Sequence, residues 1–497
     1  MEMSYDHNTY HKFMLAKADN SVAAMKAHTL KDPMRLKYHF MPQAYWMNDP
    51  NGLIYFRGEY HMFYQHHPYS SGWGAMHWGH AKSKDLLHWE HLPIALAPSD
   101  SYDLDERGGC FSGSAVEMDG ILALIYTGTI IKEGRVIQTQ CLATSSDGIT
   151  FSKYVGNPVI SAPPEGSSSD FRDPKVWKHG DKWYMVVGSG KDGKGRALLY
   201  CSNDLYSWEY VCVLAESDGT MGTMWECPDF FQLGDRYVLM FSPVGNGNRQ
   251  TVYLIGDFDY GTCTFIWDKY EAIDYGFEYY APQSFLDGEG RRLIIGWLNA
   301  WEWMPWFKSF GPPGLHNWCG AMSCPRTVEL GEQGYLKFAP AEELKSLRKE
   351  YFHLDRTVFE GEIILEVQSI QGVCLEICAE FDLLNYQADA IGIKLRCSDD
   401  GEHETALTYS LLSGELSFDR SRSDGWSEGV RTCQMDLKGR DTLKLHIFVD
   451  TCVVEVFADD GRLAMTNNIF PDPDHVKLKL FSSGGKAELV SLDIWNL

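Results

Sequence analysis

One short unit recurs five times in the first two-thirds of the chain: a strand-like apolar run, a turn centred on glycine, and a second, strongly apolar run. Apolar, β-rich runs on either side of a glycine-containing turn are typical of a β-hairpin. The copies read GLIYFRGEYHMFYQ, SAVEMDGILALIYTG, KVWKHGDKWYMVVGSG, DFFQLGDRYVLMFSP and QSFLDGEGRRLIIGWL, and their turn glycines, at nearly equal intervals, are Gly58, Gly120, Gly180, Gly234 and Gly288.

Most copies continue with a polar turn that ends on an aromatic residue, which indicates a third and a fourth strand. These turns read SKDLLHW, SSDGITF, SNDLYSW and, more loosely, GDFDYGTCTF. Five units of four strands, with almost no helical periodicity between them, predict a five-bladed β-propeller over residues 36–335. A long β-sandwich is the alternative, but the near-equal spacing of the five copies argues against it.

The rhythm stops after the fifth copy. Residues 336–350 look like a charged, helix-like linker, and the rest of the chain alternates apolar and polar residues in EIILEVQ, IGIKLRC, LKLHIFVD, CVVEVFAD and VKLKLFS. That period of two predicts a β-sandwich over residues 351–497. Residues 1–35 are expected to form an N-terminal extension, helical or irregular. The predicted fold class is therefore all-β: a five-bladed propeller followed by a C-terminal sandwich.

Charge and cysteine content narrow the possible partners. The chain of 497 residues has a net charge of −24, so a nucleic-acid partner is not expected. The N-terminus lacks the apolar run of a signal peptide, and no segment is apolar over the length needed to span a membrane. The 13 cysteines are odd in number and several lie in apolar, strand-like runs, which favours reduced thiols in a cytoplasmic protein, and the lack of a CxxC pair argues against a structural zinc site. No metal or cofactor is expected, and a homo-oligomer is possible.

The propeller prediction also predicts a site. In a propeller the first strand of each blade lies nearest the central axis, so the starts of the five first strands converge from distant parts of the sequence. Here these segments read WMNDPNG (46–52), CFSGS (110–114), FRDPK (171–175), WECPD (225–229) and YYAPQ (279–283). Three of them carry an acid, and the set also supplies polar side chains: Asp49, Asp173 and Glu226, with Asn48, Ser112, Arg172 and Gln283.

Any one of these acids has an ordinary structural explanation, because Asp before Pro is a common turn initiator. That structural explanation does not cover three carboxylates at equivalent positions of three blades. Placing like charges together costs free energy and raises at least one pKa, which a purely structural module has no reason to tolerate. Two carboxylates on either side of a scissile bond are the standard equipment of glycoside hydrolysis.

The neighbours of each acid suggest how the roles divide. Asn48, Asn51 and Gly52 could donate to Asp49 and keep it an anion, and Arg172 should keep Asp173 ionised. Glu226 stands among Met224, Trp225 and Cys227, an apolar setting that suits a carboxyl group which must hold a proton. We therefore expect two anions and one acid.

These motifs resemble those of the invertase-type fructofuranosidases of glycoside hydrolase family 32. WMNDPNG is similar to the family's nucleophile motif, FRDPK to its transition-state motif and WECPD to its acid/base motif. The resemblance continues through HMFYQHHP, GWGAMHWGHAKSKDLLHW and CFSGSA, and into the second domain at LKLHIFVDTCVVEVFADDG. It covers roughly residues 35–497, and such an ordered set of motifs is highly specific.

The resemblance implies a retaining β-fructofuranosidase that acts on sucrose or a close relative. Asp49 would attack the anomeric carbon C2 of a fructosyl unit, Glu226 would serve as acid and then as base, and Asp173 would bind fructose hydroxyls. Retention requires the carboxyl groups of Asp49 and Glu226 to be about 5–5.5 Å apart. The residues that match the fructose pocket are Asn48, Gln65, Trp73, Phe111, Ser112 and Arg172, with Tyr280 and Trp301 as weaker assignments.

Several alternatives stay open. A fructosyltransferase uses the same intermediate, a non-catalytic fructan-binding propeller needs no acids, and an inverting glycosidase can share the five-bladed scaffold. The substrate beyond fructose is also open: sucrose, sucrose 6-phosphate and short fructo-oligosaccharides all fit. A phosphate would need a cation at the pocket rim, for which the loop residues Arg107, Lys132, Arg135 and Arg249 are candidates. His77 and His80 of HWGH would lie on opposite faces of a strand, which argues against a shared metal ion.

Overall fold

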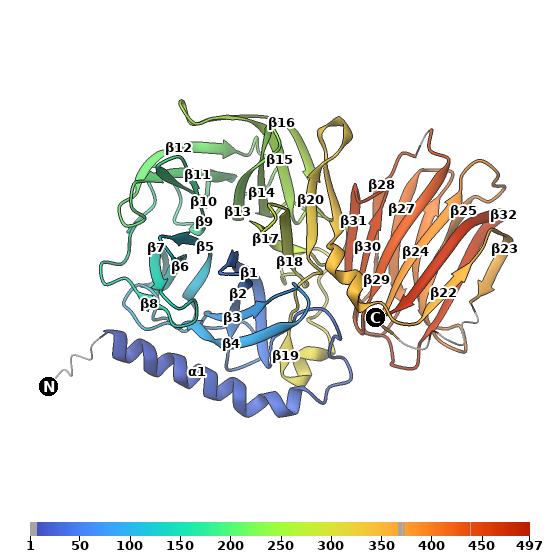
Figure 1. The fold of residues 1–497 in the computed structure, drawn as a ribbon, viewed down its shortest axis with the longest axis horizontal. Helices are drawn as coiled ribbons and strands as arrows, with labels where there is room; N and C mark the ends of the chain where they lie inside the picture. The colour runs from blue at the N-terminus through green and yellow to red at the C-terminus, as the bar shows by residue number, and fades with distance from the viewer. Residues whose placement is uncertain (1–6, 366–369, 371–372, 438) are drawn as a thin grey trace.

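The computed structural model describes residues 7–365, 370, 373–437 and 439–497, which form two β domains side by side (Figure 1). The first is a five-bladed propeller and the second is a sandwich, as the sequence predicted. The end of the expected strand EIILEVQ, residues 366–368, lies outside the described residues. One long helix, α1 (His7–Thr29), runs along the outside of the first blade (Figure 1).

Each blade is a separate sheet with four antiparallel strands, of which the inner strand comes first in the chain. The five inner hairpins fall at the predicted turns. The blades consist of β1 (Tyr45–Phe56), β2 (Glu59–His67), β3 (His77–Ser83) and β4 (Trp89–Leu96); β5 (Gly109–Met118), β6 (Ile121–Lys132), β7 (Arg135–Ser145) and β8 (Ser152–Lys153); β9 (Phe171–His179), β10 (Lys182–Lys191), β11 (Lys194–Ser202) and β12 (Glu209–Glu216); β13 (Met224–Leu233), β14 (Arg236–Val244), β15 (Val252–Asp259) and β16 (Thr264–Ala272); and β17 (Tyr280–Leu286), β18 (Arg292–Trp297), β20 (Arg326–Leu330) and β21 (Leu336–Pro340).

The fifth blade reaches further along the chain than the sequence suggested. Strand β21 occupies the start of the segment expected to be a linker and pairs with β20 over its whole length. The short strand β19 (Trp318–Cys319) pairs in parallel with the start of β1, which joins the end of the propeller to its first blade. The 3-10 helix η1 (Pro312–His316) precedes β19, η2 (Glu332–Gly334) lies between β20 and β21, and η3 (Glu342–Leu347) leads into the sandwich.

The sandwich is built from one continuous network of strands folded into two layers. Strand β32 (Lys477–Asn496) connects the layers, because its first half pairs with β25 and its second half with β24. The other strands are β22 (Tyr351–Leu354), β23 (Thr357–Ile364), β24 (Leu375–Asp382), β25 (Ala390–Cys397), β26 (Glu404–Ser410), β27 (Glu415–Arg422), β28 (Val430–Gln434), β29 (Thr442–Val449), β30 (Val453–Ala458) and β31 (Leu463–Asn468).

Buried charges join the two domains. Arg326 of the fifth blade is completely buried and bonds Glu455 of β30 (2.5 Å) and Asp274 of the propeller (2.9 Å). His39, at the start of the propeller, lies between Asp450 and Glu455 of the sandwich at 2.9 Å from each. Residues from both ends of the chain thus share one charged network at the interface.

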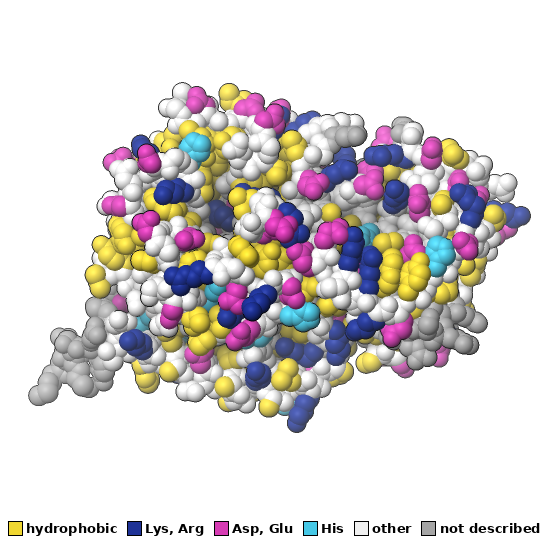
Figure 2. All heavy atoms as spheres, in the orientation of Figure 1, with side chains coloured by type: hydrophobic (Ala, Val, Ile, Leu, Met, Phe, Trp, Pro, Cys, Tyr) yellow, Lys and Arg dark blue, Asp and Glu magenta, His cyan; other side chains and the backbone are white. Residues whose placement is uncertain are grey.

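One face of the molecule is mixed in charge (Figure 2). On the face drawn in Figure 2, acidic and basic side chains are interspersed rather than gathered by sign. Within the described part of the chain, no helix combines the length and the apolar character needed to cross a membrane.

Candidate active site

A β-bulge interrupts the inner strand of every blade at the same level. Bulges add a residue to one strand and redirect its side chains, and they are common beside active sites. Asp173, Cys227 and Ala281 stand at three of these bulges with left-handed backbone conformations, φ 66°, 48° and 50°. The breaks in register lie between Met47 and Pro50, Phe111 and Gly113, Arg172 and Lys175, Glu226 and Asp229, and Tyr280 and Gln283.

The bulges direct the predicted site residues into one cavity of about 420 Å³. All three acids line it together with every pocket residue predicted from the sequence except Tyr280, which lies behind Glu226. Gln283 is also not part of the lining, because its side chain is buried and donates to the carbonyl of Gly113 (2.7 Å). The predicted acids and fructose-pocket residues that line it are Asn48, Asp49, Gln65, Trp73, Phe111, Ser112, Arg172, Asp173, Glu226 and Trp301.

Asp49 is an almost completely buried carboxylate that accepts hydrogen bonds from neutral donors. Ser112 Oγ donates to Oδ2 (2.6 Å), and Asn48 Nδ2 donates to Oδ1 (3.0 Å). Asn51 and Gly52 were the other expected donors, but among the described residues neither donates to Asp49. Burial raises the pKa of Asp49, and the hydrogen bond from Ser112 opposes that rise.

Asp173 differs most from expectation. Burial raises the pKa of this carboxyl group to about 7, and the negative charges of Glu226 and Asp49 add to the rise. Arg172 was predicted to keep Asp173 ionised; its charge does lower the pKa of Asp173, but burial outweighs that attraction. The guanidinium bonds Glu226 and Asp170 instead, and Asp173 Oδ2 accepts a hydrogen bond from the backbone N–H of Cys227 (2.9 Å).

Glu226 has a polar environment, contrary to the apolar setting predicted from its neighbours in sequence. Arg172 Nε and Nη2 both donate to Oε1 (3.0 and 2.9 Å), and the Tyr280 hydroxyl donates to Oε2 (2.5 Å). The adjacent Trp225 turns away and stacks on Phe241 in the core of the blade, with ring centroids 3.8 Å apart. Alternation along the strand explains the error, since sequence neighbours point to opposite faces.

Cys227 is a site residue that the sequence reasoning treated only as apolar surroundings. Its thiol lies 3.5 Å from Asp49 Oδ2 and 3.6 Å from Asp173 Oδ2, so it bridges the two carboxylates. Burial raises the pKa of the thiol well above its usual value, so the group remains a neutral donor. The sequence signal available was its place in WECPD, directly after the predicted acid Glu226.

Aromatic side chains form the wall and the mouth of the cavity. Trp73 is 41% exposed and meets Phe111 edge-on (ring centroids 6.1 Å apart). Trp301 both lines the cavity and packs on Trp297 (4.9 Å). Trp303, which the sequence did not single out, also lines the cavity and is 46% exposed. Flat rings with open faces suit the apolar faces of sugar rings.

One of the four candidate phosphate-binding cations reaches the cavity. Arg107 lies in its lining, and the described residues offer its guanidinium no ion-pair partner. Lys132 and Arg135 flank the turn between β6 and β7 just beyond the lining residues Ile131 and Val136. Arg249 belongs elsewhere, in a cavity between the fourth blade and the sandwich.

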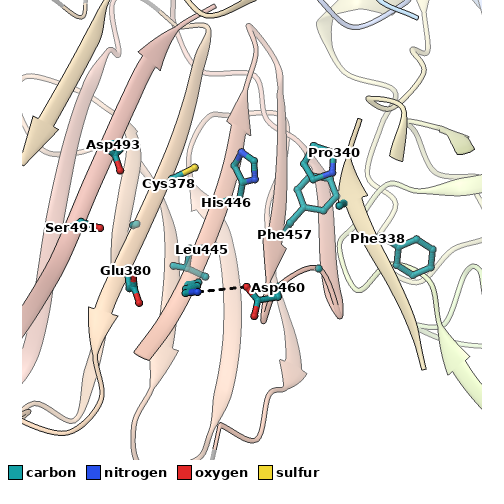
Figure 3. A pocket seen from close by; sticks show the side chains of 14 residues that line it. Phe338, Pro340, Cys378, Glu380, Leu445, His446, Phe457, Asp460, Ser491 and Asp493 are labelled. Atoms are coloured by element: carbon teal, nitrogen blue, oxygen red, sulfur yellow. Dashed lines mark ion pairs between the residues drawn. The ribbon is translucent and has the colours of Figure 1, made fainter. Parts of the chain in front are cut away.

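Among the described residues, the groups that could share a metal ion lie away from this cavity. One is His39, Cys324 and Glu455 in the charged domain interface, and another is a cluster of exposed acids beside His475. The third includes Cys378 and His446, which project from neighbouring sandwich strands into a cavity bordered by Pro340 of the propeller (Figure 3). Its carboxylate, Glu376, is already paired with Arg348 at 2.6 Å. Ion pairs therefore account for two of the groups.

Comparison with known proteins gives one consistent answer. Residues 39–340 match the model of the Glycosyl hydrolases family 32 N-terminal domain, and residues 343–496 match that of the Glycosyl hydrolases family 32 C terminal. A sucrose-6-phosphate hydrolase of Escherichia coli is 41% identical over 480 residues, covering 93% of this chain and 94% of the relative. A raffinose invertase of the same species is 40% identical over 476 residues, covering 93% and 94%.

Solved structures agree. A GH32 beta-fructofuranosidase mutant of Bombyx mori in complex with sucrose is 34% identical with a TM-score of 0.81, covering 96% of this chain and 97% of that chain. A sucrose-6-phosphate hydrolase of Lactobacillus gasseri is 26% identical with a TM-score of 0.84, covering 96% of each chain. Both domain models match in order and together span nearly the whole sequence, so the chain belongs to glycosyl hydrolase family 32.

Proposed function

We propose that this protein is a retaining β-fructofuranosidase that cleaves sucrose or sucrose 6-phosphate by double displacement. The observation that carries the proposal is the meeting of three carboxylates from three blades in one cavity, with Asp49 and Asp173 touching a single thiol. A sugar ring bound there would contact all three. The names of the relatives, which include sucrose-6-phosphate hydrolases and a raffinose invertase, support this substrate class.

Asp49 is the proposed nucleophile. Its hydrogen bonds from Ser112 and Asn48 hold the carboxylate in place, and Trp46 Nε1 in turn orients Asn48 (2.7 Å). Attack on C2 of the fructosyl unit breaks the bond to the leaving oxygen and gives a fructosyl ester of Asp49. Neutral donors suit this role, because a cation paired with the nucleophile would weaken it.

Glu226 is the proposed acid and base. It protonates the departing oxygen as the first bond breaks, and it later takes a proton from the water that hydrolyses the ester. Tyr280 and Arg172 hold the two oxygens of this carboxyl group in fixed directions. Asp173 is placed to bind fructose hydroxyls, and as positive charge develops on the ring this contact should strengthen.

The experiment is hydrolysis of sucrose and of sucrose 6-phosphate by the wild type, Asp49→Asn and Glu226→Gln. We expect Asp49→Asn to be nearly inactive and Glu226→Gln to lose about 10²- to 10⁴-fold in kcat, with both melting temperatures close to the wild type. On an activated aryl fructoside, whose leaving group needs no proton, Glu226→Gln should lose much less. Equal losses on both kinds of substrate would remove Glu226 from the acid role.

The products separate the remaining alternatives. With methanol as acceptor, retention gives methyl β-fructofuranoside, whereas an inverting enzyme would not form it by this route. Accumulation of fructo-oligosaccharides at high sucrose concentration would favour a fructosyltransferase. Binding of sucrose in calorimetry without release of glucose would instead favour a non-catalytic binding propeller.

A further inference from the structure

Two residues of the site motifs take no part in the chemistry proposed above. Lys175 ends FRDPK and Asp229 ends WECPD. Lys175 follows Asp173 on β9 and Asp229 follows Glu226 on β13, each just beyond the bulge of its strand. The Asp229 side chain is completely buried and that of Lys175 is 12% exposed.

Lys175, Asp229 and the backbone of Ser284, which belong to three blades, form a triangle of contacts. Lys175 Nζ lies 3.0 Å from Asp229 Oδ2 and also donates to the carbonyl of Ser284 on β17 (2.6 Å). The backbone N–H of Ser284 donates to the same Asp229 oxygen (2.6 Å). Inner strands β9, β13 and β17 are thereby joined through one ammonium group and one carboxylate.

Such a link matters because the three strands belong to separate sheets. No ladder of backbone hydrogen bonds fixes the spacing of one inner strand from the next, so side chains must do it. Each of the three strands carries one group of the site at its bulge: Asp173 on β9, Glu226 on β13 and Tyr280 on β17. The triangle lies directly beyond these bulges along the same strands.

The chemistry of the pair fits positioning better than stabilisation. Charge-assisted hydrogen bonds are shorter and stronger than neutral ones, which makes the spacing they set more definite. A buried ion pair, in contrast, contributes little net stability compared with apolar residues of similar size. Elsewhere on the axis neutral groups make such links, for example Ser114 Oγ to the carbonyl of Pro174 (2.8 Å).

We propose that Lys175 and Asp229 are positioning residues that hold Asp173, Glu226 and Tyr280 at their working distances. This rests on the proposed function for its kinetic consequences, but not for its geometry. Loss of the link should let the three inner strands shift relative to one another. A shift of about 1 Å in a catalytic group can cost about 10²-fold in rate.

The test uses the full-length double variant Lys175→Met/Asp229→Asn, which removes both charges and so leaves neither one buried alone. We expect a folded protein whose kcat on sucrose falls about 10²-fold while KM changes little. The loss should be smaller on an activated aryl fructoside, because misplacement of Glu226 matters less there. The isosteric single variant Asp229→Asn, which weakens the link without removing it, should show a smaller loss in the same direction.

The double variant Lys153→Met/Asp103→Asn is the matched control. Lys153 is also a buried lysine paired with an aspartate, Asp103 (2.6 Å), but it lies on β8, the outermost strand of the second blade. This control variant should lower the melting temperature and leave kcat unchanged. A folded Lys175→Met/Asp229→Asn variant with the kcat of the wild type would overturn the proposal.

A crystal structure of the Lys175→Met/Asp229→Asn variant gives a readout that needs no activity. The proposal expects the contact between the Tyr280 hydroxyl and Glu226, 2.5 Å in the native chain, to lengthen or break. Unchanged positions of Asp173, Glu226 and Tyr280 would contradict it. If the wild type itself hydrolysed no fructoside, the proposed function would fail while this geometric test would still stand.

Discussion

The three acids of the site differ in what surrounds them, and these surroundings affect the stability of the folded protein. Asp49 and Asp173 are held by neutral donors in a buried place, whereas Glu226 is held by a guanidinium and a phenol. Burial therefore raises the pKa of both aspartates. A group that is harder to ionise in the folded than in the unfolded chain lowers stability where it must be charged.

Asp173→Asn is accordingly expected to stabilise the protein at alkaline pH. Because the pKa of Asp173 is about 7 when folded and 3.8 as a free side chain, the folded state holds the proton longer, and stability falls as pH rises between these values. Each pKa unit corresponds to about 1.4 kcal/mol. Urea unfolding of the variant should show a gain at pH 8 and no difference near pH 3, together with loss of activity.

Asp147→Asn is the control of opposite sign. Backbone hydrogen bonds, the first from Thr150, hold the pKa of Asp147 at about 2. Its contribution to stability is present above the unfolded pKa and disappears as pH falls toward 2, so the variant should be destabilised at pH 8. If both variants shifted stability in the same direction at pH 8, the electrostatic account of Asp173 would be wrong.

The variant Arg107→Gln tests whether the mouth of the cavity recognises a phosphate group on the substrate. The guanidinium lines the cavity and is exposed to solvent, so it is available to a phosphate on the leaving sugar. We expect KM for sucrose 6-phosphate to rise about tenfold or more, the equivalent of one charge-assisted hydrogen bond, while KM for sucrose stays the same. Equal effects on both substrates would mean that Arg107 does not recognise phosphate.

The sequence predicted which residues form the site better than it predicted what each of them contacts. The position of each acid in a repeat shows that the acids converge, because the repeat is local and visible. What touches each acid depends on bulges and on partners some fifty residues away, as with Arg172 and Glu226. The thiol of Cys227 escaped notice for the same reason.

At the scale of elements, helix α1 protects the outer edge of the first blade. Among the described strands, β4 pairs only with β3, and its other edge would expose backbone groups. Asp19 accepts a hydrogen bond from the N–H of Ile94 (3.0 Å), and His11 Nε2 accepts one from that of Ala97 (3.2 Å). Side chains of a helix thus take the place of a further strand.

Asp19→Ala should therefore cost about 1 kcal/mol in the free energy of unfolding, the usual value of one such hydrogen bond. Removal of residues 1–30 should cost more and should promote self-association through the exposed edge. Urea unfolding and size-exclusion chromatography measure the two effects. Asn20→Ala, one residue along on the exposed side of the helix, is the control, and an equal loss there would argue against edge protection.

The propeller was predictable because the sequence signal of each hairpin, two apolar runs around a glycine turn, lies within some twenty residues. The end of the fifth blade was not, since residues 298–325, which contain η1 and β19, separate its inner hairpin from its outer strands β20 and β21. The parallel pairing of β19 with β1 was also invisible, because it joins two-residue stretches from opposite ends of the domain.

At the scale of the whole molecule, the two domains are expected to unfold together. Glu455 is buried between Arg326 and His39, and although burial works against its ionisation, their charges hold its pKa at about 2. Breaking a buried pair leaves a charge uncompensated and typically costs about 3–5 kcal/mol. The interface thus depends on charges from both domains.

Glu455→Gln should lower the free energy of unfolding by about that amount, 3–5 kcal/mol. In the wild type, calorimetry should show one transition at neutral pH, and stability should fall as pH drops from the unfolded pKa of 4.5 toward 2. Two separated transitions in the wild type at neutral pH would contradict the idea of a coupled interface.

The most direct test of the whole account is to trap the fructosyl-enzyme. Glu226→Gln should accept a fructosyl group from an activated fructoside but release it slowly, because no base activates the water. Mass spectrometry of the quenched and digested protein should then find one added fructosyl unit on the peptide that contains Asp49. Rapid turnover of the substrate with no adduct, or an adduct on a residue outside the cavity, would contradict the central claim.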